Sequence, residues 1–106
     1  MKHALAAFLL LTASLPADAA DLYDRIDRIN HAVNRLPLTN CKSFSWEKMA
    51  RLEAAGIAAR WIVVQTETGG YHAIVVVDGK WALDSRRKRV VTVDDLRADG
   101  YRIAPL

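Results

Sequence analysis

The chain has 106 residues, a net charge of +3 and one cysteine, Cys41. Small exported domains are often stabilised by disulfides, but a single cysteine excludes an internal one. Much of the positive charge lies in Arg86–Arg89. No aromatic residues interleave with this run, so we expect no nucleic-acid binding, and we interpret the run as a solvated turn rather than a patch for acidic polymers or an anionic leaflet.

The first 19 residues have the layout of a secretory signal peptide. Lys2 gives a basic start, Ala4–Leu11 is apolar, and Ala17-Asp18-Ala19 resembles a small-residue cleavage site. The apolar run is too short to span a bilayer. We therefore predict a signal peptide over residues 1–19, one domain over residues 20–106, no transmembrane segment after cleavage, and a periplasmic or secreted protein. An uncleaved membrane anchor is the alternative.

Two helices are expected next. Apolar residues at helical spacing predict an amphipathic helix over residues 21–35. A second helix is predicted over about residues 41–55, with Thr39 or Asn40 as its N-cap and Gly56 at its C-terminal end.

The rest of the chain is rich in β-branched and aromatic residues, which are typical of strands. Two helices followed by a small antiparallel sheet predict an α+β domain with N-terminal helices packed on the sheet. The expected strands cover residues 61–66, 71–77, 81–84 and 90–93, a helical turn opens at residues 94–96, and residues 101–104 close the sheet.

On a helical wheel, the second helix has one broad stripe that must pack on the sheet, and Cys41 lies on it at the first turn. Unpaired N–H groups and the helix dipole lower the pKa of a thiol there and make it more nucleophilic. A small buried hydrophobe is the alternative interpretation of Cys41. Lys48 falls on the same stripe. We expect its ammonium group to reach solvent past the sheet edge, with support of a buried carboxylate as the alternative.

The predicted hairpin places His72 near one end and Asp84 near the other. A two-residue loop at 78–79 would pair His72 with Ser85 and turn Asp84 to the opposite face. A three-residue loop over 77–79, with Gly79 at positive φ, would pair His72 directly with Asp84. Aspartate favours turns and glycine tolerates positive φ, so we predict the three-residue loop.

The sequence can therefore bring Cys41, His72 and Asp84 into one cleft. A thiol activated by a histidine that a third group orients is the general arrangement for covalent acyl transfer. Spacing alone leaves another interpretation open. Backbone groups can satisfy the hydrogen bonds of His72, and Asp84 can simply begin the basic turn. A metal site from His31 and these three residues lacks a close-spaced ligand pair, so we expect no metal and no cofactor.

The chain resembles the bacterial transglutaminase-like cysteine proteinase family over about residues 40–101, in the stretches "NCKSFSWEKMARLEAAGIAARWIVV" and "YHAIVVVDGKWALDS". The fold of that family is similar to that of papain and transglutaminase. By this resemblance Cys41 is the nucleophile, His72 the base and Asp84 the orienting acid. The helix pattern of the family is matched by Lys48, Leu52 and Gly56.

The resemblance implies an exported cysteine peptidase that hydrolyses a peptide or isopeptide bond in a protein or peptide substrate. Family members bind calcium through acidic residues beside the cysteine. Asn40 and Lys42 stand there in this chain, so the calcium site is not carried over. Many family members have a longer segment ahead of the cysteine, so we expect the substrate cleft to be either truncated or completed by a partner protein. Two alternatives remain: an amidase or acyltransferase with the same triad, and a non-catalytic exported binding module with the same fold.

Overall fold

The structure is a computed structural model that describes residues 20–106, so the predicted signal peptide lies outside the described residues. The chain is helical over residues 20–34. Within residues 20–106, no helix has both the length and the apolar character needed to cross a membrane. The elements that follow are α2 (Cys41–Ala54), β1 (Ala59–Gln65), β2 (Tyr71–Val77), β3 (Trp81–Leu83), β4 (Val91–Thr92) and α3 (Val93–Ala98).

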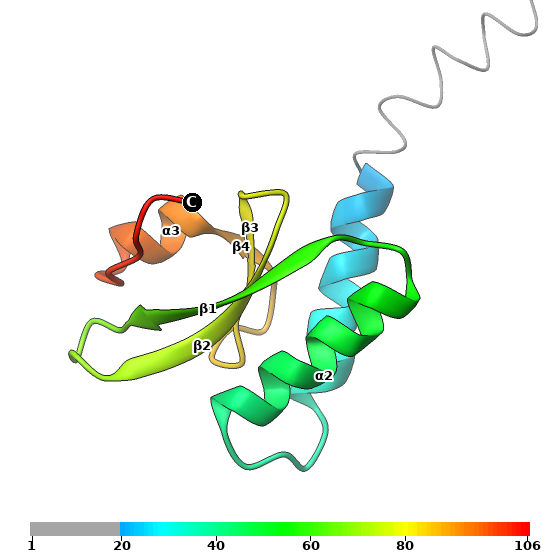
Figure 1. Cartoon of the computed structure of the whole chain (residues 1–106), viewed down its shortest axis with the longest axis horizontal. Coiled ribbons are helices and arrows are strands. Elements are labelled where there is room, and N and C mark those ends of the chain that lie inside the picture. The colour runs from blue at the N-terminus through cyan, green and yellow to red at the C-terminus, as the bar shows by residue number, and fades with distance from the viewer. Residues whose placement is uncertain (1–19) are drawn as a thin grey trace, which may run out of the picture.

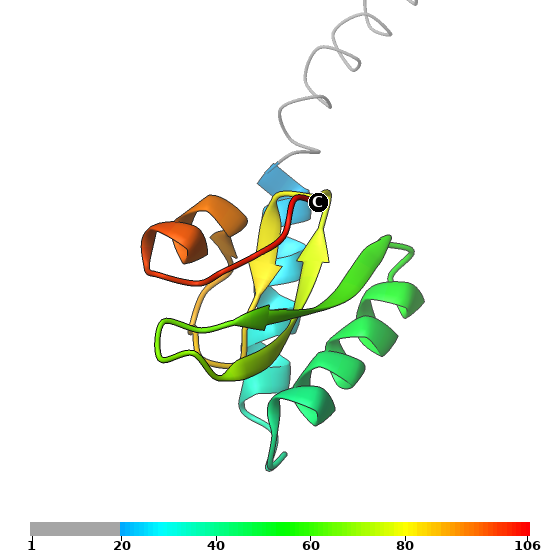
Figure 2. The same cartoon turned by 60° about the vertical axis from the view of Figure 1, so that its left-hand side comes forward.

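The four strands form one antiparallel sheet in the order β1-β2-β3-β4. Figure 1 shows α2 and the N-terminal helix on one side of this sheet and α3 on the other, and Figure 2 shows the same three layers after rotation. The predicted α+β class, with helices ahead of an antiparallel sheet, is confirmed.

Strand β2 is the centre of the core because both of its faces are covered. Val75 and Val77 pack with Ile26 of the N-terminal helix and Leu52 of α2. Residues of the opposite parity pack with α3 and the C-terminal segment. Successive side chains of a strand point to opposite faces, so a strand buried on both faces has a continuous apolar sequence, as residues 73–77 do. The cluster on the α3 side consists of Val64, Ile74, Val76, Ala82, Val93, Leu96 and Tyr101.

Helix α2 begins and ends where the predicted caps lie. The Oδ1 atom of Asn40 accepts a hydrogen bond from the Ser43 N–H group at 2.9 Å, which satisfies one free donor of the first turn. At the other end Gly56 has a φ of 73°, and the Ile57 N–H group donates to the Leu52 carbonyl at 2.9 Å. This closes the helix in a Schellman turn.

The hairpin turn differs from the predicted one. Gly79 has a positive φ of 61°, as predicted, but Asp78 also has a positive φ, of 58°. Two successive residues with positive φ form a type I′ turn, and the Lys80 N–H group donates to the Val77 carbonyl at 3.2 Å. Strand pairing begins at Val77 and Trp81, so the loop covers residues 78–80 and the predicted loop over 77–79 is wrong.

This turn shifts the register of β2 and β3 by two residues. Val75 pairs with Leu83, and continuing the register would place Asp84 opposite Ile74. The prediction that His72 and Asp84 are directly opposed is therefore wrong. A shift of two residues preserves the side-chain face, whereas a shift of one would reverse it. His72 and Asp84 consequently lie on the same face in a diagonal relation.

Several other boundaries differ from the predicted ones. β1 begins two residues earlier than predicted, and β3 and β4 are each shorter. Thr92 and Asp95 form a capping box, with both hydrogen bonds at 3.0 Å, so α3 already starts at Val93. Residues 101–104 form no regular strand, and Arg102 makes only an isolated bridge to Gln65.

Candidate active site

Cys41 is the first residue of α2, and it is half-buried rather than enclosed in the core. The Ser45 hydroxyl group connects this first turn to β2. Its Oγ atom lies 2.7 Å from the Cys41 carbonyl oxygen and 3.1 Å from that of Ala73. β3 ends at Leu83, so Ala73 lies on a part of β2 that no strand covers on that side. The start of α2 docks there, next to His72.

His72 and Asp84 are in direct contact. The Nε2 atom of His72 lies 2.6 Å from Oδ1 of Asp84. His72 is 7% exposed and Asp84 is fully buried. The diagonal arrangement is close enough for this contact because Asp84 lies just beyond the end of β3. With Nε2 engaged by the carboxylate, Nδ1 is the ring nitrogen left for the thiol of Cys41.

Asp84 accepts two further hydrogen bonds. The Arg86 backbone N–H group donates to Oδ1 at 2.9 Å, and the Tyr101 hydroxyl group donates to Oδ2 at 2.8 Å. A buried carboxylate needs such donors to remain ionised. Tyr101 is a site residue that the sequence patterns did not predict. The one available signal was general, since a buried tyrosine usually finds a partner for its hydroxyl group.

The N-terminal helix holds the loop that carries Asp84. The Nδ2 atom of Asn34 donates to the backbone carbonyls of Asp84 at 3.2 Å and of Arg87 at 3.0 Å. The fully buried Asn30 donates to the same Arg87 carbonyl at 3.2 Å. These contacts join positions 50 or more residues apart, and sequence periodicity contains no information about them.

The pKa values of Cys41 and His72 are shifted in directions that favour an ion pair between the two side chains. Burial raises the pKa of the Cys41 thiol, but hydrogen bonding to the Ala73 backbone and to His72, together with the charge of His72, lowers it below its ordinary value. The hydrogen bond to Asp84 raises the pKa of His72; burial opposes this, and the charges of Asp84 and Cys41 reinforce it. Both directions favour thiolate and imidazolium.

Lys48 lies on the buried side of α2 and is 1% exposed. The prediction that its ammonium group reaches solvent is therefore wrong. Burial lowers the pKa of Lys48 to about 8, although attraction to the charge of Asp84 partly opposes this. Burial also raises the pKa of Asp84, but the hydrogen bonds from His72, Arg86 and Tyr101 bring it below its ordinary value. A buried ammonium group thus lies within the electrostatic influence of an ionised carboxylate.

The basic run forms ion pairs within the fold. Arg86 pairs with Glu67 at 2.6 Å, and Arg87 pairs with Asp99 at 2.8 Å. Arg89 lies 3.4 Å from a carboxylate oxygen of Asp27. The guanidinium group of Arg86 also donates to the Tyr101 hydroxyl oxygen at 3.1 Å. Three of the four basic side chains of the run are therefore paired with carboxylates of the same chain.

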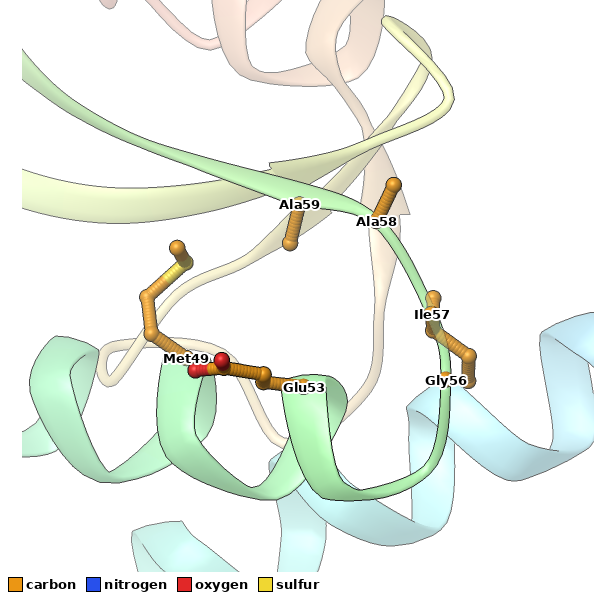
Figure 3. Close-up of a pocket in the computed structure, with 6 residues that line it drawn as sticks. All are labelled: Met49, Glu53, Gly56, Ile57, Ala58 and Ala59. Carbon is orange, nitrogen blue, oxygen red and sulfur yellow. The ribbon is translucent and has the colours of Figure 1, made fainter.

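Two hollows beside α2 differ in their chemistry. The one in Figure 3, of about 370 Å³, lies at the C-terminal end of α2 and contains Glu53 as its one titratable side chain. The other, of about 280 Å³, lies at the N-terminal end and is lined by both Cys41 and His72. Only the second hollow offers a nucleophile. Within residues 20–106, no three His, Cys, Asp or Glu side chains are grouped so that they could hold a metal ion.

No protein-family model, no curated protein and no solved structure matches this chain.

Proposed function

We propose that the protein is an exported cysteine peptidase with a transglutaminase/papain-like core, in which Cys41 is the nucleophile, His72 the general base and Asp84 the orienting acid. The observation that carries this proposal is the buried 2.6 Å hydrogen bond between His72 Nε2 and Asp84 Oδ1. A carboxylate that holds one ring nitrogen fixes the tautomer and orientation of the imidazole towards its other neighbour. That neighbour is a thiol at a helix N-terminus.

In the first step the Cys41 sulfur forms a bond to the carbonyl carbon of a peptide or isopeptide. His72 holds the thiol proton and gives it to the leaving amine as the C–N bond breaks. In the second step His72 takes a proton from water, and the hydroxide attacks the thioester. The C–S bond then breaks, and the carboxylic acid leaves. Asp84 stays ionised throughout and stabilises the imidazolium.

The first turn of α2 supplies the donor for the developing oxyanion. The first N–H groups of a helix have no intrahelical acceptor, and their dipoles favour negative charge. The backbone N–H group of Cys41 is the donor we assign to this role.

The thiol chemistry tests the proposal. We expect the iodoacetamide alkylation rate of Cys41 to titrate with an apparent pKa below the reference of about 8.5, and His72→Ala to raise that pKa. His31→Ala, an exposed histidine of the N-terminal helix, is the matched control and should leave the profile unchanged. Identical pH profiles of the alkylation rate for the parent and His72→Ala would contradict the proposal and favour the non-catalytic binding module.

Hydrolysis of a casein-derived fluorogenic substrate, with Cys41→Ala as the blank, tests turnover. If Cys41 is reactive but product is released only after an amine is added, the acyltransferase alternative is favoured. Export is tested by the mass of the mature protein, which should begin at Ala20 or within a residue or two. An intact Met1 in a soluble cytoplasmic fraction would contradict export.

A further inference from the structure

Exposed apolar side chains gather beside the thiol. Among residues 20–106, the large hydrophobic side chains that remain exposed are Trp46 at 56%, Val63 at 54%, Tyr71 at 80% and Leu106 at 44%. Val63 and Tyr71 line the same hollow as Cys41. Trp46 stacks on Trp61, which also lines it, with ring centroids 5.3 Å apart and planes inclined by 8°.

Two neighbouring strands form the apolar floor of this hollow. Val63 of β1 is directly opposed to Ala73 of β2, and Tyr71 is two residues further along β2 on the same face. Trp61 is two residues away along β1, again on that face. Four side chains of one sheet face therefore form a continuous surface that ends at the first turn of α2.

Two side chains of this surface, Val63 and Tyr71, contribute little to folding in their present state. Apolar area stabilises a fold only when it is removed from water, and Val63 and Tyr71 are mostly in water. Contiguous exposed apolar area next to reactive groups is typical of binding sites. The volume of about 280 Å³ lies just below the range of ligand pockets, roughly 300–1,000 Å³, so the hollow suits one side chain rather than a whole ligand.

Resting on the proposed function, we infer that this hollow is a specificity subsite for a bulky apolar or aromatic side chain on the acyl side of the scissile bond. The Cys41 sulfur becomes bonded to the acyl carbon, so a side chain near that carbon lies within reach of a hollow that Cys41 itself lines. Aromatic rings of the substrate can pack on Tyr71 and Trp61. Besides the Cys41–His72 pair, the one charged side chain of the lining is Lys42, so a cationic substrate side chain is disfavoured.

Thiol-directed probes that differ in one side chain test this subsite. The chloromethyl ketones of N-acetylphenylalanine, N-acetylglycine and N-acetyllysine each form a C–S bond with Cys41 and release chloride. We expect the phenylalanine probe to label the protein about 10- to 100-fold faster than the glycine probe, as burial of a phenyl group allows. Iodoacetamide, which has no side chain to place, is the reference for each variant.

Val63→Asp should reduce the phenylalanine-to-glycine ratio severalfold and increase the rate of the lysine probe, since a carboxylate then lies in the floor. Tyr71→Ala should reduce the first ratio alone. Both positions are mostly exposed, so each change removes only a limited buried surface. The matched control is Leu106→Asp, an exposed apolar residue outside the hollow, and it should leave every ratio unchanged.

The outcomes separate the two proposals. If His72→Ala slows the reaction with iodoacetamide but the parent labels equally fast with all three ketones, the subsite inference is overturned while the nucleophile stands. Equal ratios in the parent and Val63→Asp would overturn it as well. If the parent reacts with iodoacetamide no faster than His72→Ala, the proposed function itself fails.

Discussion

Replacing Lys48 by methionine should make the protein more stable. The pKa of the buried ammonium group falls from 10.5 to about 8, so its charged form is disfavoured in the folded state. Each tenfold change in proton affinity corresponds to about 1.4 kcal/mol, which gives a cost of about 3 kcal/mol at pH 7. Attraction to Asp84 is already included in this figure. Methionine has a similar unbranched chain and can fill the same space without a charge.

The sign of the pH dependence follows from the same pKa. Below pH 8 both folded and unfolded states carry the proton, so the full cost of the buried charge is present. Between pH 8 and 10.5 the folded protein releases the proton first, while the unfolded chain retains it, and the stability of the parent rises. The free energy of unfolding of Lys48→Met should therefore exceed that of the parent by about 3 kcal/mol at pH 7 and by only about 1 kcal/mol at pH 9.5.

Urea unfolding followed by tryptophan fluorescence measures this difference. Lys42→Met is the matched control, because Lys42 is an exposed lysine on the same helix, and its change should stay within about 0.5 kcal/mol. A Lys48→Met protein that is less stable than the parent at pH 7 would refute the reasoning. It would mean that attraction to Asp84 outweighs the cost of burying the ammonium group.

Three further changes test the network around the site. Tyr101→Phe removes a donor to a buried carboxylate and should lower the free energy of unfolding by about 1.5–3 kcal/mol in urea; an unchanged midpoint would mean that Asp84 does not depend on that hydroxyl group. Asp84→Asn should keep its far-UV circular dichroism yet lose roughly 10⁴-fold in peptide hydrolysis, because an amide can hold the wrong imidazole tautomer; full turnover would leave Asp84 a purely structural role. Asn40→Ala should cost about 1 kcal/mol by thermal unfolding, whereas Asn40→Ser retains a capping oxygen and should cost much less.

We expect the buried charge of Lys48 to lower the stability of the fold. We expect Lys48 to stabilise the fold less than an apolar residue of its size would, and its charge is attracted to the carboxylate that holds His72. Buried titratable groups with shifted pKa values gather at functional sites more often than elsewhere. The position of Lys48 thus agrees with a site in which the ionised state of Asp84 matters.

Local chemistry made much of the fold predictable from the sequence. The caps of α2 follow from Asn40 and Gly56, whose side chain and backbone freedom act within a few residues. The extent of β2 follows from its unbroken apolar run. Cys41 at a helix start and His72 on a strand could be recognised in the same way, because each depends only on its own element.

The relation between elements was decided by the tertiary structure. The hairpin register depended on Asp78 adopting positive φ, and two apolar hairpin faces gave no preference that could have corrected the prediction. The contact between His72 and Asp84 still forms because the observed register differs from the predicted one by two residues, which leaves both side chains on the same face. Tyr101 and Asn34 reach Asp84 from 17 and 50 residues away. Such contacts form only when packing brings distant segments together, and neither periodicity nor turn chemistry carries that information.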